Sequence, residues 1–148
     1  MKHDLKLPLP AEAFIPHRRP MRLVDTLISC SGSAGVVESN VAADCVLVDA
    51  AGFLDEAAFV ELLAQGYAVI KGYDDTLNDK EISEGYLVGA RKMRITGRAH
   101  AGDRLLISIR TVGSFEGFAV AEGEIMHGDE TIASGSIKLW IVNEGGAA

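Results

Sequence analysis

The feature that most constrains the fold is one long stretch that is apolar on every side. Residues 57–70 include only two strongly polar side chains, Glu61 and Gln65. A helix that is hydrophobic all round has to be buried, so residues 54–73 are predicted to form a central helix. Gly66 lies inside it. Because glycine costs about 1 kcal/mol relative to alanine in a helix interior, Gly66 is expected to mark close packing against another backbone.

The rest of the chain is typical of a sheet. Apolar and polar residues alternate along six short segments, which is the pattern of antiparallel strands with one covered face. Residues 74–84 form a polar, charged loop between the helix and the later strands. We therefore expect an α+β fold in which an antiparallel sheet of five or six strands wraps around one long central helix. The expected strands are residues 21–30, 36–43, 85–96, 104–110, 117–127 and 131–143.

The 148 residues fit a single domain. Four prolines make residues 1–20 an irregular lead-in with one helical turn at Ala11 to Phe14, and residues 144–148 are expected to be a flexible tail. One sheet layer would leave part of the helix uncovered, so we expect a second copy to complete its burial in a homodimer. Trp140 is expected to serve core or dimer packing.

Composition argues against several classes of protein. A net charge of −7 at pH 7 argues against a nucleic-acid binder, which needs a basic surface. No uncharged apolar run approaches the roughly 20 residues that span a bilayer, and the first residues lack the apolar stretch of a signal peptide. We therefore expect a cytoplasmic protein with no membrane partner. The two cysteines have no metal-ligand spacing, and no nucleotide motif is present, so neither a metal nor a cofactor is expected.

Four short motifs are distributed along nearly the whole chain. They are IPHRRPMRLVD at residues 15–25, VELLAQ at 60–65, GYLVGARKMR at 85–94 and AGDRL at 101–105. In this order they resemble the β-hydroxyacyl-acyl-carrier-protein dehydratases of the hot-dog fold, and most closely the dehydratase-like proteins of aryl-polyene-type clusters. The resemblance implies action on 3-hydroxyacyl thioesters of acyl carrier protein or coenzyme A, in fatty-acid or polyene-type biosynthesis. It also implies a homodimer, a higher oligomer or pairing with a paralogue.

One motif of that family is missing from this sequence. The dehydratases carry a Gly-His-Phe-Pro-Gly loop just before the central helix, and its histidine completes a catalytic pair with a helix glutamate. The corresponding residues 44–54, DCVLVDAAGFL, contain no histidine. Two alternatives to a dehydratase therefore remain open. One is an acyl thioesterase that uses the helix carboxylate, and the other is a non-catalytic acyl-binding protein or partner subunit of an active dehydratase.

Glu61 is the strongest catalytic candidate, because the catalytic glutamate of the family falls at this position. Its neighbours one turn away include Ala57, Ala58 and Ala64, which leave a groove beside the carboxylate for substrate. Gln65 lies one turn further on, where it could orient the carboxylate or contact a substrate carbonyl. Burying an ionisable group typically costs several kcal/mol, which favours a functional role for Glu61 over a structural one.

Three further residues complete the predicted site. His17 is the only histidine inside a matched motif and is the first substitute for the missing base, although its segment is mainly architectural in the family. Gly89 lies in a strand that resembles the substrate-tunnel wall, where a free amide could polarise a thioester carbonyl; a β-bulge explains this glycine equally well. Asp49, just before the helix, is either a polar replacement for the histidine or a turn residue.

Overall fold

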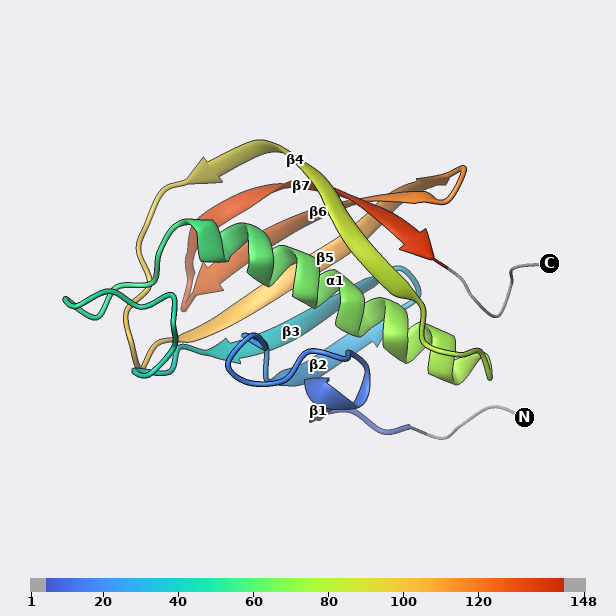
Figure 1. Ribbon diagram of the computed structural model, residues 1–148, viewed down its shortest axis with the longest axis horizontal. Helices are drawn as coiled ribbons and strands as arrows, with labels where there is room; N and C mark the ends of the chain where they lie inside the picture. Colours follow the sequence, from blue (N-terminus) through green and yellow to red (C-terminus); the bar gives the residue numbers. More distant parts are fainter. Residues whose placement is uncertain (1–4, 143–148) are drawn as a thin grey trace.

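A computed structural model describes residues 5–142, in which one long helix lies across the inner face of a single curved sheet (Figure 1). The predicted tail at residues 144–148 lies outside this range. The helix α1 spans Ala57–Leu77, and a short 3-10 helix, η1, spans Ala11–Ala13. The strands are β1 (Leu9–Pro10), β2 (Thr26–Ser31), β3 (Ala34–Asn40), β4 (Glu84–Ile95), β5 (Arg104–Phe115), β6 (Phe118–His127) and β7 (Glu130–Val142).

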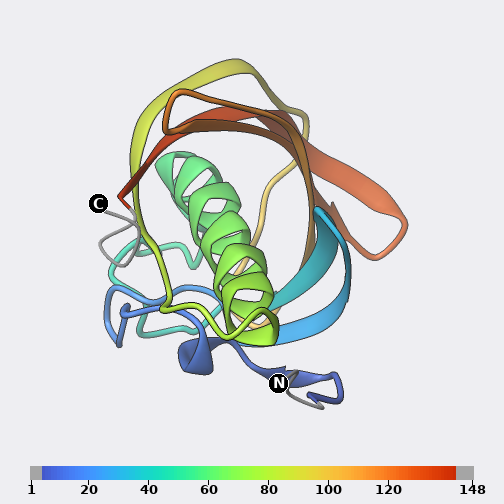
Figure 2. The same cartoon turned by 90° about the vertical axis from the view of Figure 1, so that its right-hand side faces the viewer.

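The sheet is antiparallel throughout, in the order β1-β2-β3-β5-β6-β7-β4. It curls around α1, as the view along the helix shows (Figure 2), so the predicted arrangement of one helix wrapped by a sheet is confirmed. The strand count is seven rather than the expected five or six. The additional strand is β1, whose two residues pair with Leu27 and Thr26. A two-residue strand in a proline-rich segment is too short to show alternation.

The central helix has the expected position but runs further than its pattern indicated. It begins where the Asp55 side chain accepts the N–H of Ala57 at 2.8 Å. It ends at Leu77 rather than near residue 73, because Asp75 is buried and its carboxylate accepts the N–H of Ser83 at 3.0 Å. A charged residue predicted to lie in a solvated loop is therefore part of the helix.

Gly66 lies where the helix packs closely against β5. A Cβ at this position would lie 3.2 Å from Ile107 Cγ2 and 3.3 Å from Ile109 Cγ1, both on β5. The close packing predicted for Gly66 is therefore present, although its neighbours are side chains rather than a backbone.

The lead-in contains the expected turn and shortens the next strand. Phe14 donates its N–H to Ala11 O at 3.0 Å, which closes η1. The strand β2 begins at Thr26 rather than at residue 21. The Gln65 side chain on α1 bonds to Met21 O and to the Leu23 N–H, while β3 contributes the hydroxyl of Ser39 to Leu23 O and the carbonyl of Glu38 to the Asp25 N–H. A helix side chain thus holds the lead-in against the core.

Candidate active site

Glu61 lies in the wall of a pocket between α1 and the first residues of β4. Small, polar and apolar side chains share the lining, and the pocket encloses about 510 Å³, counting the part open to solvent. Its helical residues follow the three- and four-residue spacing of one helix face. The lining consists of Glu61, Ala64, Gln65, Tyr67, Ala68 and Lys71 from α1, Ser83 just before β4, Gly85 and Leu87 from β4, Leu139 and Ile141 from β7, and His17 from the lead-in.

Gln65 fixes the direction of the Glu61 side chain. Gln65 is fully buried, and its Nε2 donates to Glu61 Oε2 at 2.6 Å and to Met21 O at 2.8 Å. Its Oε1 accepts the N–H of Leu23 at 2.8 Å. Both amide hydrogens are therefore used within the protein. This geometry fits the first of the two predicted roles, orienting the carboxylate, better than contact with a substrate carbonyl.

His17 lines the same pocket as Glu61, although the two residues lie 44 positions apart in the sequence. Its Nδ1 is buried and has no hydrogen-bond partner among the described residues. The backbone around it is held by Arg18, whose Nη1 donates to Ile15 O and to His17 O at 2.8 Å each. Because buried polar atoms in native proteins are normally hydrogen-bonded, an unpaired ring nitrogen at a pocket wall suits contact with a ligand.

Three other predicted residues lie elsewhere. Ala57 is exposed at the first position of α1, and Ala58 is fully buried in the core. The alanines that line the pocket are instead Ala64 and Ala68. Gly89 lies beside a register shift in β4 and does not line the pocket, and a Cβ there would meet no atom within 4 Å. The substrate-binding roles of Ala57, Ala58 and Gly89 remain predictions.

Two residues that sequence reasoning missed belong to the same helix face. Tyr67 and Lys71 continue the spacing that starts at Glu61, and this spacing was the signal that could have found them. Burial, and then the charges of Asp75 and Asp74, raise the pKa of Tyr67 to about 12, so its phenol is protonated at neutral pH. Lys71 Nζ pairs with Asp75 Oδ1 at 2.5 Å.

The loop before α1 is organised without the missing histidine. Asp49 Oδ1 accepts the N–H groups of Ala51 and Phe53 at 2.9 Å each, which fits the turn interpretation of Asp49. His100, from the connection between β4 and β5, lies with its Nε2 3.1 Å from Ala51 O. The contact with His100 holds the loop at residues 49–53 against the connection between β4 and β5.

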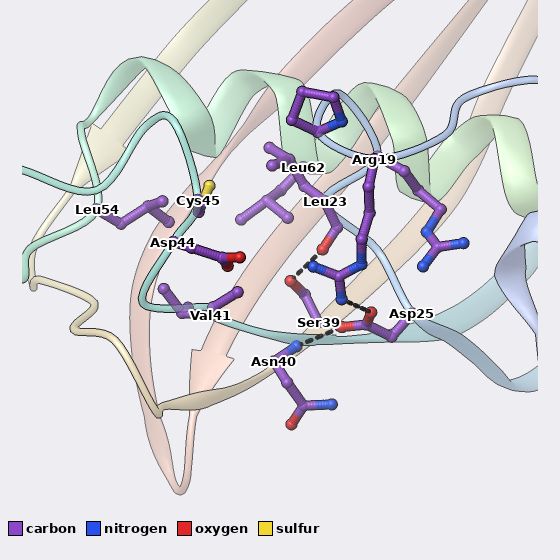
Figure 3. Close-up of a pocket in the computed structure, with 13 residues that line it drawn as sticks. Arg19, Leu23, Asp25, Ser39, Asn40, Val41, Asp44, Cys45, Leu54 and Leu62 are labelled. Carbon is purple, nitrogen blue, oxygen red and sulfur yellow. Dashed lines mark hydrogen bonds and ion pairs between the residues drawn. The ribbon is translucent and has the colours of Figure 1, made fainter.

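A second pocket, of about 580 Å³ counting its open part, lies beside the pre-helix loop (Figure 3). Leu54 and Leu62 contribute to its apolar base, while the side chains of Asp44 and Arg19 extend toward each other across it (Figure 3). Arg19 also pairs with Asp25 at 3.7 Å. None of the predicted catalytic residues lines this pocket.

Two negative observations concern residues 5–142. No cluster of three or more histidine, cysteine, aspartate or glutamate side chains in this range could hold a metal ion. No helix in the same range has the length and apolar character needed to cross a membrane.

Comparison with known proteins identifies the family. The model of the ApeP-like dehydratases matches residues 9–145. The chain belongs to the ApeP-like dehydratase family. A chain of the dehydratase heterocomplex ApeI:P from Xenorhabdus doucetiae is similar over 93% of each chain, with 25% identity and a TM-score of 0.85. The predicted resemblance to hot-dog dehydratases of the aryl-polyene type is therefore confirmed.

More distant structures share the hot-dog fold. A hypothetical thioesterase from Streptococcus pneumoniae, solved with coenzyme A, is 11% identical with a TM-score of 0.63, over 79% of this chain and 84% of that one. The Escherichia coli PaaI protein is 16% identical with a TM-score of 0.61, over 77% of this chain and 80% of that one. At these identities the similarity concerns the fold alone. No curated protein matches the chain significantly.

Proposed function

We propose that this member of the ApeP-like dehydratase family removes water from 3-hydroxyacyl thioesters, with Glu61 as general acid and His17 as general base. The observation that carries this proposal is that both residues line one pocket. In addition, Nδ1 of His17 is buried without a hydrogen-bond partner among residues 5–142. In this arrangement His17 takes the place of the missing loop histidine.

The proposed reaction uses each group once. Neutral His17 takes a proton from C2 of the thioester, and the electron pair of that C–H bond forms the C2–C3 double bond. The C3–O bond breaks, and protonated Glu61 gives its proton to the departing hydroxyl, which leaves as water. The products are an enoyl thioester, a carboxylate and an imidazolium, and the proton returns from imidazolium to carboxylate through solvent. Such proton transfers by positioned side chains typically contribute about 10²- to 10⁴-fold in rate.

The surroundings of Glu61 support this division of roles. Among the described residues, the hydrogen bond that reaches the carboxylate comes from Gln65 to Oε2, so Oε1 is the oxygen proposed to protonate the hydroxyl. Leu87, Leu139 and Ile141 form the opposite wall. An apolar wall beside a polar one suits an acyl chain whose reacting end faces the helix.

We propose that the protein acts in the cytoplasm within a complex, on substrates carried by acyl carrier protein or coenzyme A. The strand β4 is at the edge of the sheet, and almost every residue along it is exposed, including the apolar Leu87 and Val88. An exposed apolar edge strand is a template for pairing with another chain. The solved ApeI:P heterocomplex supports a paralogous dehydratase as the partner, and a second copy is the alternative.

A non-catalytic role within such a complex is the second candidate. The observation that favours it is the loop at residues 44–54, which lacks the histidine of related dehydratases. In that case the partner would supply the base, and His17 would serve only the architecture of the lead-in.

The experiment compares substrates and variants. The protein, alone and with its paralogous partner, is incubated with 3-hydroxyacyl and simple acyl thioesters of acyl carrier protein, and the products are identified. We expect enoyl thioester to form, and Glu61→Gln and His17→Asn each to lower kcat by about 100-fold or more. His127→Asn, at the exposed end of β6, is the control and should retain full activity. Release of free thiol would indicate a thioesterase, and dehydration unaffected by His17→Asn would contradict the role of His17.

A further inference from the structure

Four aromatic side chains form a continuous row across four neighbouring strands. Tyr86 on β4 is opposite Trp140 on β7, Trp140 is opposite Phe118 on β6, and Phe118 is opposite Phe115 on β5. Because neighbouring strands lie about 4.8 Å apart, the four side chains, which we name the aromatic row, form a strip of about 15 Å. The rings of Phe118 and Trp140 touch edge to face, with centroids 4.7 Å apart.

The aromatic row lies on the outer face of the sheet, away from the Glu61 pocket. Leu139 and Ile141 line that pocket, and side chains alternate between the faces of a strand, so Trp140 between them points outward. Phe115 is 72% exposed, Tyr86 54% and Trp140 40%. The row is therefore not part of the core or of the proposed substrate site.

The exposed area of the row is comparable to the largest apolar patch of a typical monomer. Complete burial of one aromatic side chain removes about 150–250 Å² from water, so these exposed fractions leave several hundred Å² of apolar surface. The largest such patch on a typical monomer is about 300–600 Å² and often marks an interaction site. A standard interface buries about 800 Å² per partner, so the row supplies roughly half of one.

The charges around the row are mixed. Lys138 Nζ lies 4.3 Å from the centre of the Phe118 ring. Tyr86 donates its hydroxyl to Glu84 Oε2 at 3.0 Å, and Glu116 lies in the hairpin turn between Phe115 and Phe118. Carboxylates at both ends of the row disfavour a nucleic acid or an anionic membrane. A surface with an apolar centre, a cation and carboxylates is instead complementary to a copy of itself.

We propose that the aromatic row binds the aromatic row of a second copy of this chain. A two-fold contact brings the same patch of both subunits together, and therefore requires a patch of this self-complementary kind. The row includes Tyr86 of β4, but the contact uses the outer face of the sheet and not the backbone edge of that strand. It joins two copies back to back, while each copy keeps its β4 edge for the dehydratase partner and its Glu61 pocket open on the inner face.

Sedimentation equilibrium of the purified chain, without partner, tests the proposal. Phe115→Ser and the double variant Phe115→Ser/Trp140→Ser remove apolar surface from the row, and Val46→Ser is the matched control, because Val46 is 63% exposed in the loop before α1. We expect the row variants to raise the dissociation constant of self-association at least tenfold, and the control to leave it unchanged. Thermal unfolding should show that all variants are folded. Phe115→Ser, at the exposed end of β5, keeps the test valid if the double variant is not folded.

Two outcomes would overturn the proposal. One is self-association that is absent from the native chain or that the row variants leave unchanged. The other is loss of binding to the paralogous partner with self-association intact, which would assign the row to that partner instead.

Discussion

At the residue scale, some contacts of the site can be predicted from the sequence and others cannot. The pairing of Glu61 with Gln65 follows from their four-residue spacing on a helix, and it is present. The position of His17 could not be derived in this way, because it depends on hydrogen bonds that connect Gln65 to Met21 and Leu23, more than 40 residues away. Lys71 is a different case, because its four-residue spacing from Asp75 is local and was overlooked only because Asp75 was assigned to a loop.

Gln65 should contribute to the stability of the fold as well as to the orientation of the Glu61 side chain. Gln65→Leu removes the partners of Met21 O and the Leu23 N–H, and each unsatisfied buried group costs about 1–3 kcal/mol. We expect this variant to lose roughly 2–4 kcal/mol in the free energy of unfolding, measured by urea denaturation. Glu61→Gln, the control, should change it by less than about 1 kcal/mol. Equal stability of Gln65→Leu and the native chain would show that the lead-in is not held by this side chain.

Tyr67 should make stability depend on alkaline pH. Its pKa is about 12 in the folded protein and about 10 in the unfolded chain, so the unfolded state loses its proton first as the pH rises. The contribution of Tyr67 is present below pH 10 and is lost between about pH 10 and 12, by up to roughly 2–3 kcal/mol. Tyr67→Phe should therefore lose less stability than the native chain between pH 9 and 11.5 in urea titrations. Identical pH dependence of the two proteins would contradict this.

At the scale of elements, periodicity predicted the helix and six of the strands, because burial imposes those patterns directly. Boundaries were less accurate where tertiary contacts replace local preference. Asp75 extends α1, and its carboxylate accepts the N–H of Ser83. The segment before β2 bonds in part to Gln65 on α1 and in part to β3, and neither contact leaves a periodic signal. Pairing of β1 with β2 is a contact between distant segments that leaves no periodic signal.

The packing of the lead-in on α1 can be tested with a glycine. A Cβ at Gly72 would lie 2.3 Å from Phe14 O, so Gly72→Ala has to displace the backbone of the lead-in. We expect a net loss of about 1–3 kcal/mol in the free energy of unfolding, even though alanine favours a helix by about 1 kcal/mol. Gly89→Ala, where a Cβ meets no atom within 4 Å, should change stability by less than about 0.5 kcal/mol. A stabilised Gly72→Ala variant would contradict the observed packing.

At the scale of the whole molecule, the side of α1 that carries Glu61 faces β4, a strand at the edge of the curved sheet. The sequence predicted that a second chain completes the burial of the helix. Within this chain every residue of α1 except Ala57 is already buried or partly buried, and what a partner would cover is the exposed edge strand β4. The sequence could not identify this partner, because a homodimer and a pair of paralogues demand the same apolar edge. The similarity to the ApeI:P heterocomplex favours the paralogue.

A charge on the edge strand β4 should weaken binding of the paralogous partner. Val88 is 53% exposed on β4, and lysine on an edge strand is a common barrier to pairing with another chain. We expect Val88→Lys to weaken binding of the paralogous partner at least tenfold in isothermal titration calorimetry. Ile82→Lys, 41% exposed just before β4, should bind normally. Unchanged affinity of Val88→Lys would show that the partner binds elsewhere.

The central claim is that Glu61 and His17 act on one substrate in one pocket. The most direct measurement is a crystal structure of the protein with an unreactive amide analogue of a 3-hydroxyacyl pantetheine thioester. Our account predicts the C3 hydroxyl within about 3.2 Å of the Glu61 carboxyl group and a C2 hydrogen facing the imidazole of His17. An analogue bound in the pocket of Figure 3 instead, or a Glu61 side chain turned away from the bound hydroxyl, would contradict it.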